Sequence, residues 1–233
     1  MEPRRPALQR PGGRADAFRA TAVVGRLVDR TVATYDHIAE RYTARATYPL
    51  EQELACFKQM VPKGGLVLDV GCGPGQYTRA LEARGLRVVG FDLSRGLLRQ
   101  AQAAGTPRLV CADMRRIPIA DECADGCFVC ASLLHLPHAQ APQALLEFRR
   151  VLRPGGALYV GVKEGEGEKW VAGREGYERF FAYYRLEEIN RLIWAAGFEV
   201  MDGWINPPGK GQRHNWLNRF AVARACRGWE GEV

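Results

Sequence analysis

The residues best placed to do chemistry lie in the segment Leu66-Val-Leu-Asp-Val-Gly-Cys-Gly-Pro-Gly75, where an apolar run of strand length leads into three glycines. A helical pattern begins directly afterwards, at Gln76. Glycines at the carboxyl end of a strand let the backbone approach a ligand closely, because no Cβ stands in the way. The segment therefore predicts a ligand-binding loop built on Gly71, Gly73 and Gly75.

The spacing of these glycines argues against a phosphate site. A dinucleotide fingerprint G-x-G-x-x-G that began at Gly71 would require glycine at position 76, where the chain has Gln76. A P-loop would end in Gly-Lys-Ser or Gly-Lys-Thr, and no such triplet follows the loop. We therefore expect a ligand that is not recognised through a pyrophosphate or triphosphate.

Three acidic residues stand at the ends of successive predicted strands. Asp69 precedes the glycine loop, Asp92 ends the next strand 23 residues later, and Asp113 follows the third strand. A carboxylate at the end of the second strand can accept hydrogen bonds from both hydroxyls of a ribose, and Asp113 could accept one from an adenine amine. Any one acid alone could be a helix cap, but the three together predict a nucleoside site.

Cys123, Cys127 and Cys130 have the spacing C-x3-C-x2-C, which radical enzymes use to hold an iron–sulfur cluster. The residues around them follow the pattern of a buried strand, on which Cys127 and Cys130 would point to opposite faces. We therefore predict core or strand-end positions for these thiols, and no metal site. The seven cysteines of the chain are interpreted as reduced thiols rather than as a disulfide framework.

Strand-like and helix-like segments alternate from position 66 onward. Strands are predicted at 66–70, 86–92, 108–112, 124–131 and 157–163, and helices at 76–84, 94–104 and 142–152. This alternation predicts a parallel sheet with helices on both faces. A helix at 186–196 then precedes strands at 198–205 and 216–225, which the turn-rich segment between them should make antiparallel.

The N-terminal part divides into a basic tail and a helical segment. Residues 1–30 hold seven arginines against Glu2, Asp16 and Asp29, which is +4 of the formal net charge of +7. We expect residues 1–25 to be a disordered basic tail and residues 227–233 to be a short C-terminal tail. Between them, residues 26–226 should form one domain that opens with a helical lid over about 26–61, where apolar residues recur at steps of three and four.

The composition also limits the location and partners of the protein. No apolar stretch reaches the roughly 18 residues that a membrane-spanning helix needs, so no membrane role is expected. The N-terminus lacks the apolar core and cleavage site of a secretory signal, and we expect a cytoplasmic protein. The basic tail could hold RNA through phosphate contacts, but a solvated tail without a partner is the preferred interpretation.

The segments VLDVGCGPGQYTRAL, VVGFDLS, ADMRRIPIADECADGCFVCASLLHL and LLEFRRVLRPGGALYV resemble, in this order, the successive motifs of class I S-adenosylmethionine-dependent methyltransferases over about residues 30–225. The resemblance implies a three-layer, Rossmann-like α/β fold whose seven-stranded sheet is mostly parallel, with an antiparallel last strand and helices on both faces. It also implies S-adenosylmethionine as cofactor and S-adenosylhomocysteine as product. The cofactor-binding residues implied by position are Gly71, Cys72, Gly73 and Gly75 for the methionine portion, Asp92 and Leu93 for the ribose, Asp113 and Met114 for the adenine, and Ala131 and Ser132 for the sulfonium side, with Asp69 beside the loop.

The methyl group of a sulfonium is already electrophilic, so the protein mainly has to align a nucleophile with the S–CH3 bond and exclude water. His135, after the fourth strand, is the candidate general base, although packing under the next helix would explain this residue as well. The residues expected to contact the acceptor or to form the lid are Tyr35, Tyr42, Tyr48, Lys163, Glu164, Glu166 and His214.

The body of the chain lacks a combined aromatic and basic motif for nucleic acid, which favours a small-molecule acceptor. RNA is the second hypothesis, because YDHIAERY and the motifs after it are similar to wobble-uridine tRNA methyltransferases, although SLLHLP does not match those enzymes after the fourth strand. A non-catalytic protein that binds S-adenosylmethionine is a third hypothesis. We therefore expect a methyltransferase that acts on a small molecule by direct in-line transfer.

Overall fold

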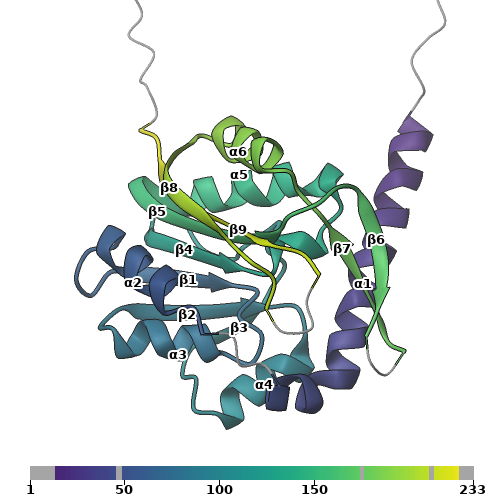
Figure 1. The fold of residues 1–233 in the computed structure, drawn as a ribbon, viewed down its shortest axis with the longest axis horizontal. Coiled ribbons are helices and arrows are strands. Elements are labelled where there is room, and N and C mark those ends of the chain that lie inside the picture. The colour runs from purple at the N-terminus through teal and green to yellow at the C-terminus, as the bar shows by residue number, and fades with distance from the viewer. Residues whose placement is uncertain (1–13, 46–48, 174–175, 210–212, 226–233) are drawn as a thin grey trace, which may run out of the picture.

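A computed structural model describes residues 14–45, 49–173, 176–209 and 213–225 of the chain, with side chains from position 27 onward. Seven strands form one sheet in the order β3-β2-β1-β4-β5-β9-β8. Their bounds are β1 Leu66–Val70, β2 Arg87–Asp92, β3 Leu109–Cys111, β4 Ala124–Cys130, β5 Leu152–Lys163, β8 Phe198–Asn206 and β9 Trp216–Ala223. The sheet lies at the centre of the molecule (Figure 1).

Strands β1 to β5 run parallel to one another, and β9 runs antiparallel to both of its neighbours, β5 and β8. This confirms the mostly parallel, seven-stranded sheet with an antiparallel last strand. The chain continues from β1 to β2 and β3 on one side and then returns to place β4 on the other side of β1. Open α/β sheets bind ligands in the crevice at such a reversal of strand order, outside the carboxyl ends of the strands.

Helices cover both faces of the sheet, as the alternating pattern predicted. On one face, α5 (Ala141–Val151) and α6 (Leu186–Ala195) bury their apolar sides against the strands. On the other face, α2 (Glu51–Met60) and α3 (Gln76–Ala83) do the same. Cys127 of β4 packs into the first core and Cys130 into the second, which confirms that these two thiols point to opposite faces.

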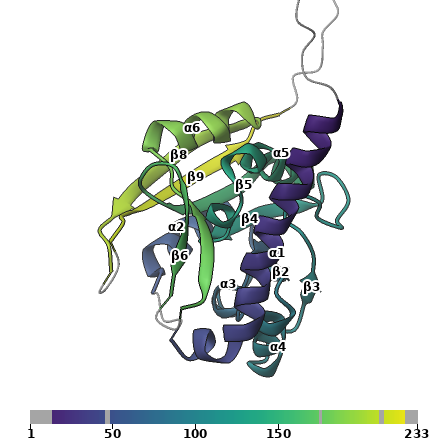
Figure 2. The same ribbon diagram turned by 90° about the vertical axis from the view of Figure 1, so that its right-hand side faces the viewer.

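Two elements outside the sheet lie together at the carboxyl ends of the strands. Helix α1 (Arg14–Arg45) runs beside a two-stranded hairpin formed by β6 (Glu168–Ala172) and β7 (Glu178–Ala182), and Figure 2 shows both from that end of the molecule. Thr34 Oγ1 donates to the carbonyl oxygen of Glu178 at 2.8 Å, and the amide of Phe180 donates to Thr31 Oγ1 at 3.1 Å. The hairpin is therefore attached to α1 by main-chain as well as side-chain groups.

Helix α1 is also attached to α4 (Arg95–Ala103), through a residue in the same stretch of the helix. One oxygen of Asp36 accepts hydrogen bonds from Ser94 Oγ and from the amide of Gly96, both at 2.7 Å. Ser94 also caps α4, since its Oγ accepts from the amide of Leu97 at 3.1 Å, as the sequence predicted. The carboxylate of Asp36 thus lies at the N-terminus of α4, where the helix dipole favours a negative charge.

Two features of the fold correct the predictions from sequence. Helix α1 begins at Arg14, inside the segment expected to be disordered through residue 25, because arginine and alanine, which dominate that segment, are strong helix formers. The β6–β7 hairpin is a second difference, because no strands were predicted between residues 163 and 186. The rest of the predicted N-terminal tail, Tyr48 and the predicted C-terminal tail lie outside the described residues. None of the helices in the described ranges is both long and apolar enough to cross a bilayer.

Candidate active site

The loop between β1 and α3 takes its shape from glycine conformations and main-chain hydrogen bonds. Gly71, Gly73 and Gly75 have φ angles of 76°, 54° and 74°, in the left-handed region that favours glycine. The amides of Gly71 and Cys72 both donate to the carbonyl oxygen of Phe91, at 2.7 and 2.9 Å. The sequence-predicted loop is therefore tied to the end of β2, the strand that carries Asp92.

Only one of the three glycines borders open space. A Cβ on Gly73 would meet no neighbour closer than Leu97 Cδ1, at 4.0 Å, whereas a Cβ on Gly75 would collide with Thr106. Cys72 is only 3% exposed, and its side chain packs against Gly90 rather than facing outward. A ligand can thus approach the backbone at Gly73, which fits the cradle expected for the methionine portion of S-adenosylmethionine.

Asp92 holds the glycine loop against the end of β2. Its Oδ2 accepts from the amide of Gly73 at 2.9 Å, and its Oδ1 accepts from the amide of Ser94 at 2.8 Å. Burial raises the pKa of this carboxyl, and the hydrogen bonds from these two amides oppose that effect. Because a carboxylate oxygen can accept more than one hydrogen bond, these contacts leave capacity for the two ribose hydroxyls.

The residues predicted to surround the adenine lie beside Asp92. Strands β2 and β3 are in register, with Asp92 opposite Cys111, so Leu93 and Asp113 follow at the same edge of the sheet. Asp113 forms an ion pair with Arg115 and accepts from its amide at 2.8 Å. Leu93 and Met114 are half-buried against the core. Arg115, which the sequence analysis missed, thus shares the carboxylate that was predicted to bind the adenine amine.

The structure gives Asp69 a contact within the protein. Its side chain is 1% exposed, and its Oδ2 accepts from Thr78 Oγ1 at 2.6 Å. Burial raises the pKa of this carboxyl to about 7, and the nearby charge of Asp92 adds to the effect. Asp69 therefore joins the end of β1 to α3 beneath the loop, and its contact with a cofactor stays a prediction.

The end of β4 lies against the same loop. Ala131 has a φ of 53°, which is uncommon for a residue with a side chain and occurs often at functional sites. Ser132 is 6% exposed, and its Oγ donates to the carbonyl oxygen of Val70 at 2.6 Å. Ser132 thus stands next to Gly71 and links the ends of two adjacent strands, and Ala131 directly precedes it in the chain.

Tyr35 and His135 come together from α1 and the short helix η1 (Leu133–His135), with His135 Nε2 2.9 Å from the Tyr35 hydroxyl. His135 Nδ1 lies 2.7 Å from the carbonyl oxygen of Phe180 on β7. A carbonyl only accepts, so Nδ1 carries the proton and Nε2 accepts from the phenol. Burial lowers the pKa of His135 to about 3, and the positive charges of Arg179 and Lys163 add to the effect. The ring is therefore neutral and connects three elements.

Two cations lie around the Phe181 ring beside His135. The Lys163 ammonium, at the end of β5, is 4.3 Å from the centroid of Phe181 and 5.6 Å from that of Trp216. The Arg179 guanidinium is 5.4 Å from the centroid of the same Phe181 ring. Arg179 and Phe181 were missed in the sequence, because they belong to the unpredicted hairpin. We call Lys163 and Arg179 the cationic pair.

The other residues predicted to contact the acceptor or to form the lid differ in their surroundings. Tyr42 packs edge-on against Tyr35, with ring centroids 5.3 Å apart. Glu164 and His214 lie together, since His214 Nδ1 donates to the carbonyl oxygen of Glu164 at 3.0 Å. Glu166 instead pairs with Arg185 at the exposed surface. Within the described ranges, no three His, Cys, Asp or Glu side chains are grouped so that they could hold a metal ion.

The chain matches a model of the methyltransferase domain over residues 68–160, which includes the glycine loop, Asp92, Asp113 and His135. A malonyl-[acyl-carrier protein] O-methyltransferase of Pectobacterium atrosepticum is 33% identical over 202 residues, which cover 85% of this chain and 71% of that enzyme. The enzyme of the same name from Serratia marcescens is 37% identical over 146 residues, which cover 59% of this chain and 55% of that enzyme. The chain therefore spans about half the length of some of these relatives.

The chain is also similar to a tRNA methyltransferase and to a solved methyltransferase structure. A tRNA (carboxymethyluridine(34)-5-O)-methyltransferase of Mus musculus is 31% identical over 135 residues, which cover 57% of this chain and 20% of that protein. Among solved structures, the 1,6-didemethyltoxoflavin-N1-methyltransferase of Burkholderia thailandensis, with bound S-adenosylhomocysteine, has a TM-score of 0.69 at 22% identity and covers 94% of both chains. The sheet order, the glycine loop and these matches define one class of protein. The chain belongs to the class I S-adenosylmethionine-dependent methyltransferases.

Proposed function

We propose that this protein is an active methyltransferase that uses S-adenosylmethionine and methylates a carboxylate oxygen of a small acyl acceptor. The loop at Gly73, Asp92 with Leu93, and Asp113 with Met114 would hold the cofactor. When bound, S-adenosylmethionine supplies an electrophilic methyl group and leaves as S-adenosylhomocysteine. The acceptor would occupy the side bounded by α1, η1, the end of β5 and the β6–β7 hairpin.

The hydrogen bonds of His135 carry this proposal. Its Nδ1 is protonated toward Phe180, and its Nε2 already accepts a hydrogen bond from Tyr35. A ring in this state, and with a strongly lowered pKa, is a poor base for removing a proton from a hydroxyl or an amine. A carboxylate is ionised at neutral pH and needs no base, so it is the oxygen nucleophile that these groups can use.

The names of the relatives support the same chemistry. Malonyl and carboxymethyl groups, after which the Serratia marcescens and Mus musculus enzymes are named, both contain a carboxylate. The two acceptors differ greatly in size, because one is carried on a protein and the other on a tRNA. The names therefore support a carboxylate as the group that is methylated, and they do not identify the rest of the acceptor.

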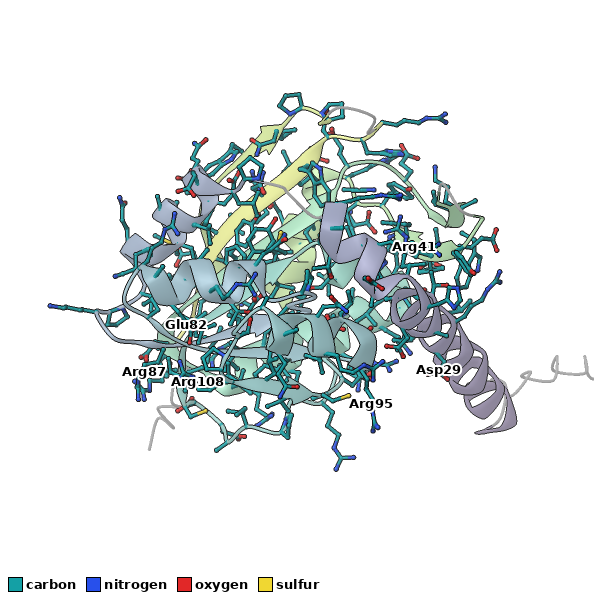
Figure 3. The ribbon with its side chains drawn as sticks, turned by 90° about the horizontal axis from the view of Figure 1, so that it is seen from below. Asp29, Arg41, Glu82, Arg87, Arg95 and Arg108 are labelled. Carbon is teal, nitrogen blue, oxygen red and sulfur yellow. The ribbon has the colours of Figure 1, made fainter. Side chains whose placement is uncertain are left out.

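The RNA hypothesis stays the second candidate, because two relatives are named as tRNA methyltransferases. Exposed arginines lie on the face shown in Figure 3, where Arg87 and Arg95 point outward. Arg108 on the same face is paired with Glu82, so part of this positive charge is neutralised within the protein. The described part of this face therefore gives only weak support for binding a polyanion.

Methyl transfer to acyl thioesters and to bulk tRNA tests the choice between the two acceptors. We expect transfer to malonyl thioesters of a small thiol, and only weak tRNA binding at physiological salt. Transfer to tRNA, together with an affinity that falls steeply between low and physiological salt, would replace the small-acceptor proposal with the RNA hypothesis. A protein that binds S-adenosylmethionine but methylates neither class of acceptor would contradict the carboxylate proposal.

A further inference from the structure

The cationic pair, Lys163 and Arg179, lies on the acceptor side of the predicted cofactor site. The amide of Ala131, at the predicted sulfonium side, donates to the carbonyl oxygen of Gly161 at 2.9 Å. Lys163 stands two residues further along β5, so it belongs to the strand end adjacent to Ala131. Arg179 reaches the same region from β7, where its guanidinium is 5.5 Å from the centroid of the Tyr35 ring.

The positive charge of Lys163 is not balanced by the protein around it. In the described part of the chain, its ammonium contacts the aromatic rings of Phe181 and Trp216 and forms no ion pair. Its charged neighbours are Arg179 and Lys169, both positive. Burial together with these like charges disfavours the charged form of Lys163, and its pKa is lowered to about 8.

A half-buried cation whose charged neighbours are also cations is costly for a fold, and such arrangements are typical of functional sites. Structural lysines at strand ends are usually paired with a carboxylate or extended into water. An anionic ligand would supply the missing negative charge, and two cations near one another suit the two oxygens of a carboxylate. The aromatic rings would keep water away from that pair and so strengthen its attraction to an anion.

We infer that Lys163, assisted by Arg179, binds the acceptor carboxylate and is the residue that selects anionic acceptors. In this arrangement His135 is a positioning residue: it accepts from the Tyr35 phenol, donates to the Phe180 carbonyl, and so fixes α1 against the hairpin that carries Arg179. This inference rests on the proposed function, because it assigns residues to the carboxylate acceptor proposed there.

The test compares Lys163→Met, which keeps the apolar stem and removes the charge, with Lys163→Arg, which keeps the charge. The probes are the malonyl, succinyl and glutaryl thioesters of N-acetylcysteamine, each beside a neutral acyl thioester of equal length. Binding to protein saturated with S-adenosylhomocysteine is measured by calorimetry, and methyl transfer is measured separately. Lys63→Met is the matched control, since Lys63 is exposed in the segment before β1.

We expect Lys163→Met to weaken binding of the carboxylate probes by about tenfold or more, the loss of one charge-assisted contact. Neutral probes and S-adenosylhomocysteine should bind as before, Lys163→Arg should recover part of the loss, and Lys63→Met should change nothing. If the wild type prefers carboxylate probes and Lys163→Met keeps that preference, this inference is wrong and the proposed function stands. If the wild type itself shows no preference for any carboxylate probe, both are wrong.

Discussion

The side chain of Ser132 occupies the space that any side chain at position 71 would need. A Cβ built on Gly71 would lie 2.8 Å from Ser132 Oγ and closer still to Ser132 Cβ. Ser132 cannot move away freely, because its hydroxyl donates to the carbonyl oxygen of Val70 at 2.6 Å. Gly71 also has a φ of 76°, so both its conformation and its surroundings require glycine.

Replacing Gly71 by alanine should therefore disrupt the loop and lower the affinity for S-adenosylhomocysteine by more than about tenfold. Gly64→Ala is a matched control, because Gly64 has a φ of 71° and no neighbour within 4 Å of a Cβ. The control should cost about 1 kcal/mol of stability through backbone strain alone. Calorimetry measures the affinity of both variants for S-adenosylhomocysteine, and thermal unfolding measures their stability. Equal effects in the two variants would mean that the contact with Ser132 is unimportant.

Asp92 should be needed for both the shape of the loop and cofactor affinity. Asp92→Ala removes the acceptors for the amides of Gly73 and Ser94, and we expect a loss of at least about tenfold in S-adenosylhomocysteine affinity. Because two main-chain donors lose their partner, the variant should also lose on the order of 1–3 kcal/mol of stability. Asp92→Asn keeps one acceptor oxygen and should lie between the wild type and the alanine variant. Wild-type affinity in Asp92→Ala would remove this residue from the cofactor site.

The contact between Asp36 and the N-terminus of α4 should hold helix α1 in place. Asp36→Ala removes the acceptor of two hydrogen bonds and a negative charge beside the helix dipole, for an expected loss of about 1–2 kcal/mol in unfolding free energy. Asp29→Ala on the same helix is the control, since Asp29 is exposed and lies at the surface (Figure 3). Chemical denaturation of both variants gives the comparison. An equal loss of unfolding free energy in the two variants would show that the hydrogen bonds of Asp36 do not stabilise the protein.

Acceptor binding should weaken as the pH rises through about 8, because Lys163 has a pKa lowered to about 8 and binds the anion only when protonated. The groups that face it are Arg179, Lys169, His135 and His214. The two histidines have lowered pKa values and are already neutral in this range, so they add no transition there. The KM for a carboxylate acceptor should be constant below this pH and increase above it. In Lys163→Arg the increase should disappear, and a profile that does not change would contradict the assignment.

The sequence predicted those parts of the protein whose pattern is local. The glycine loop, the acids at strand ends and the alternation of strands and helices follow from neighbouring residues, and the structure places them as expected. The start of α1 was placed too late, since the arginines that suggest a solvated tail are also good helix formers.

Contacts between distant segments could not be predicted in the same way. The hairpin strands EKWVA and ERFFA are short and carry charges, so their apolar residues do not form a clear period. Arg179 therefore could not be assigned to the acceptor side. A catalytic role for His135 stays a prediction, because the protonation state of its ring depends on contacts with Tyr35 and Phe180, which are 100 and 45 positions away.

We propose that the glycine loop and the strand-end carboxylates bind S-adenosylmethionine and not a dinucleotide. Calorimetric titration of the full chain with S-adenosylmethionine, S-adenosylhomocysteine and NAD tests this assignment. We predict dissociation constants on the order of micromolar for the first two ligands and no binding of NAD, because Gln76 breaks the pyrophosphate fingerprint. Tight binding of NAD, with no heat on addition of S-adenosylmethionine, would contradict the account.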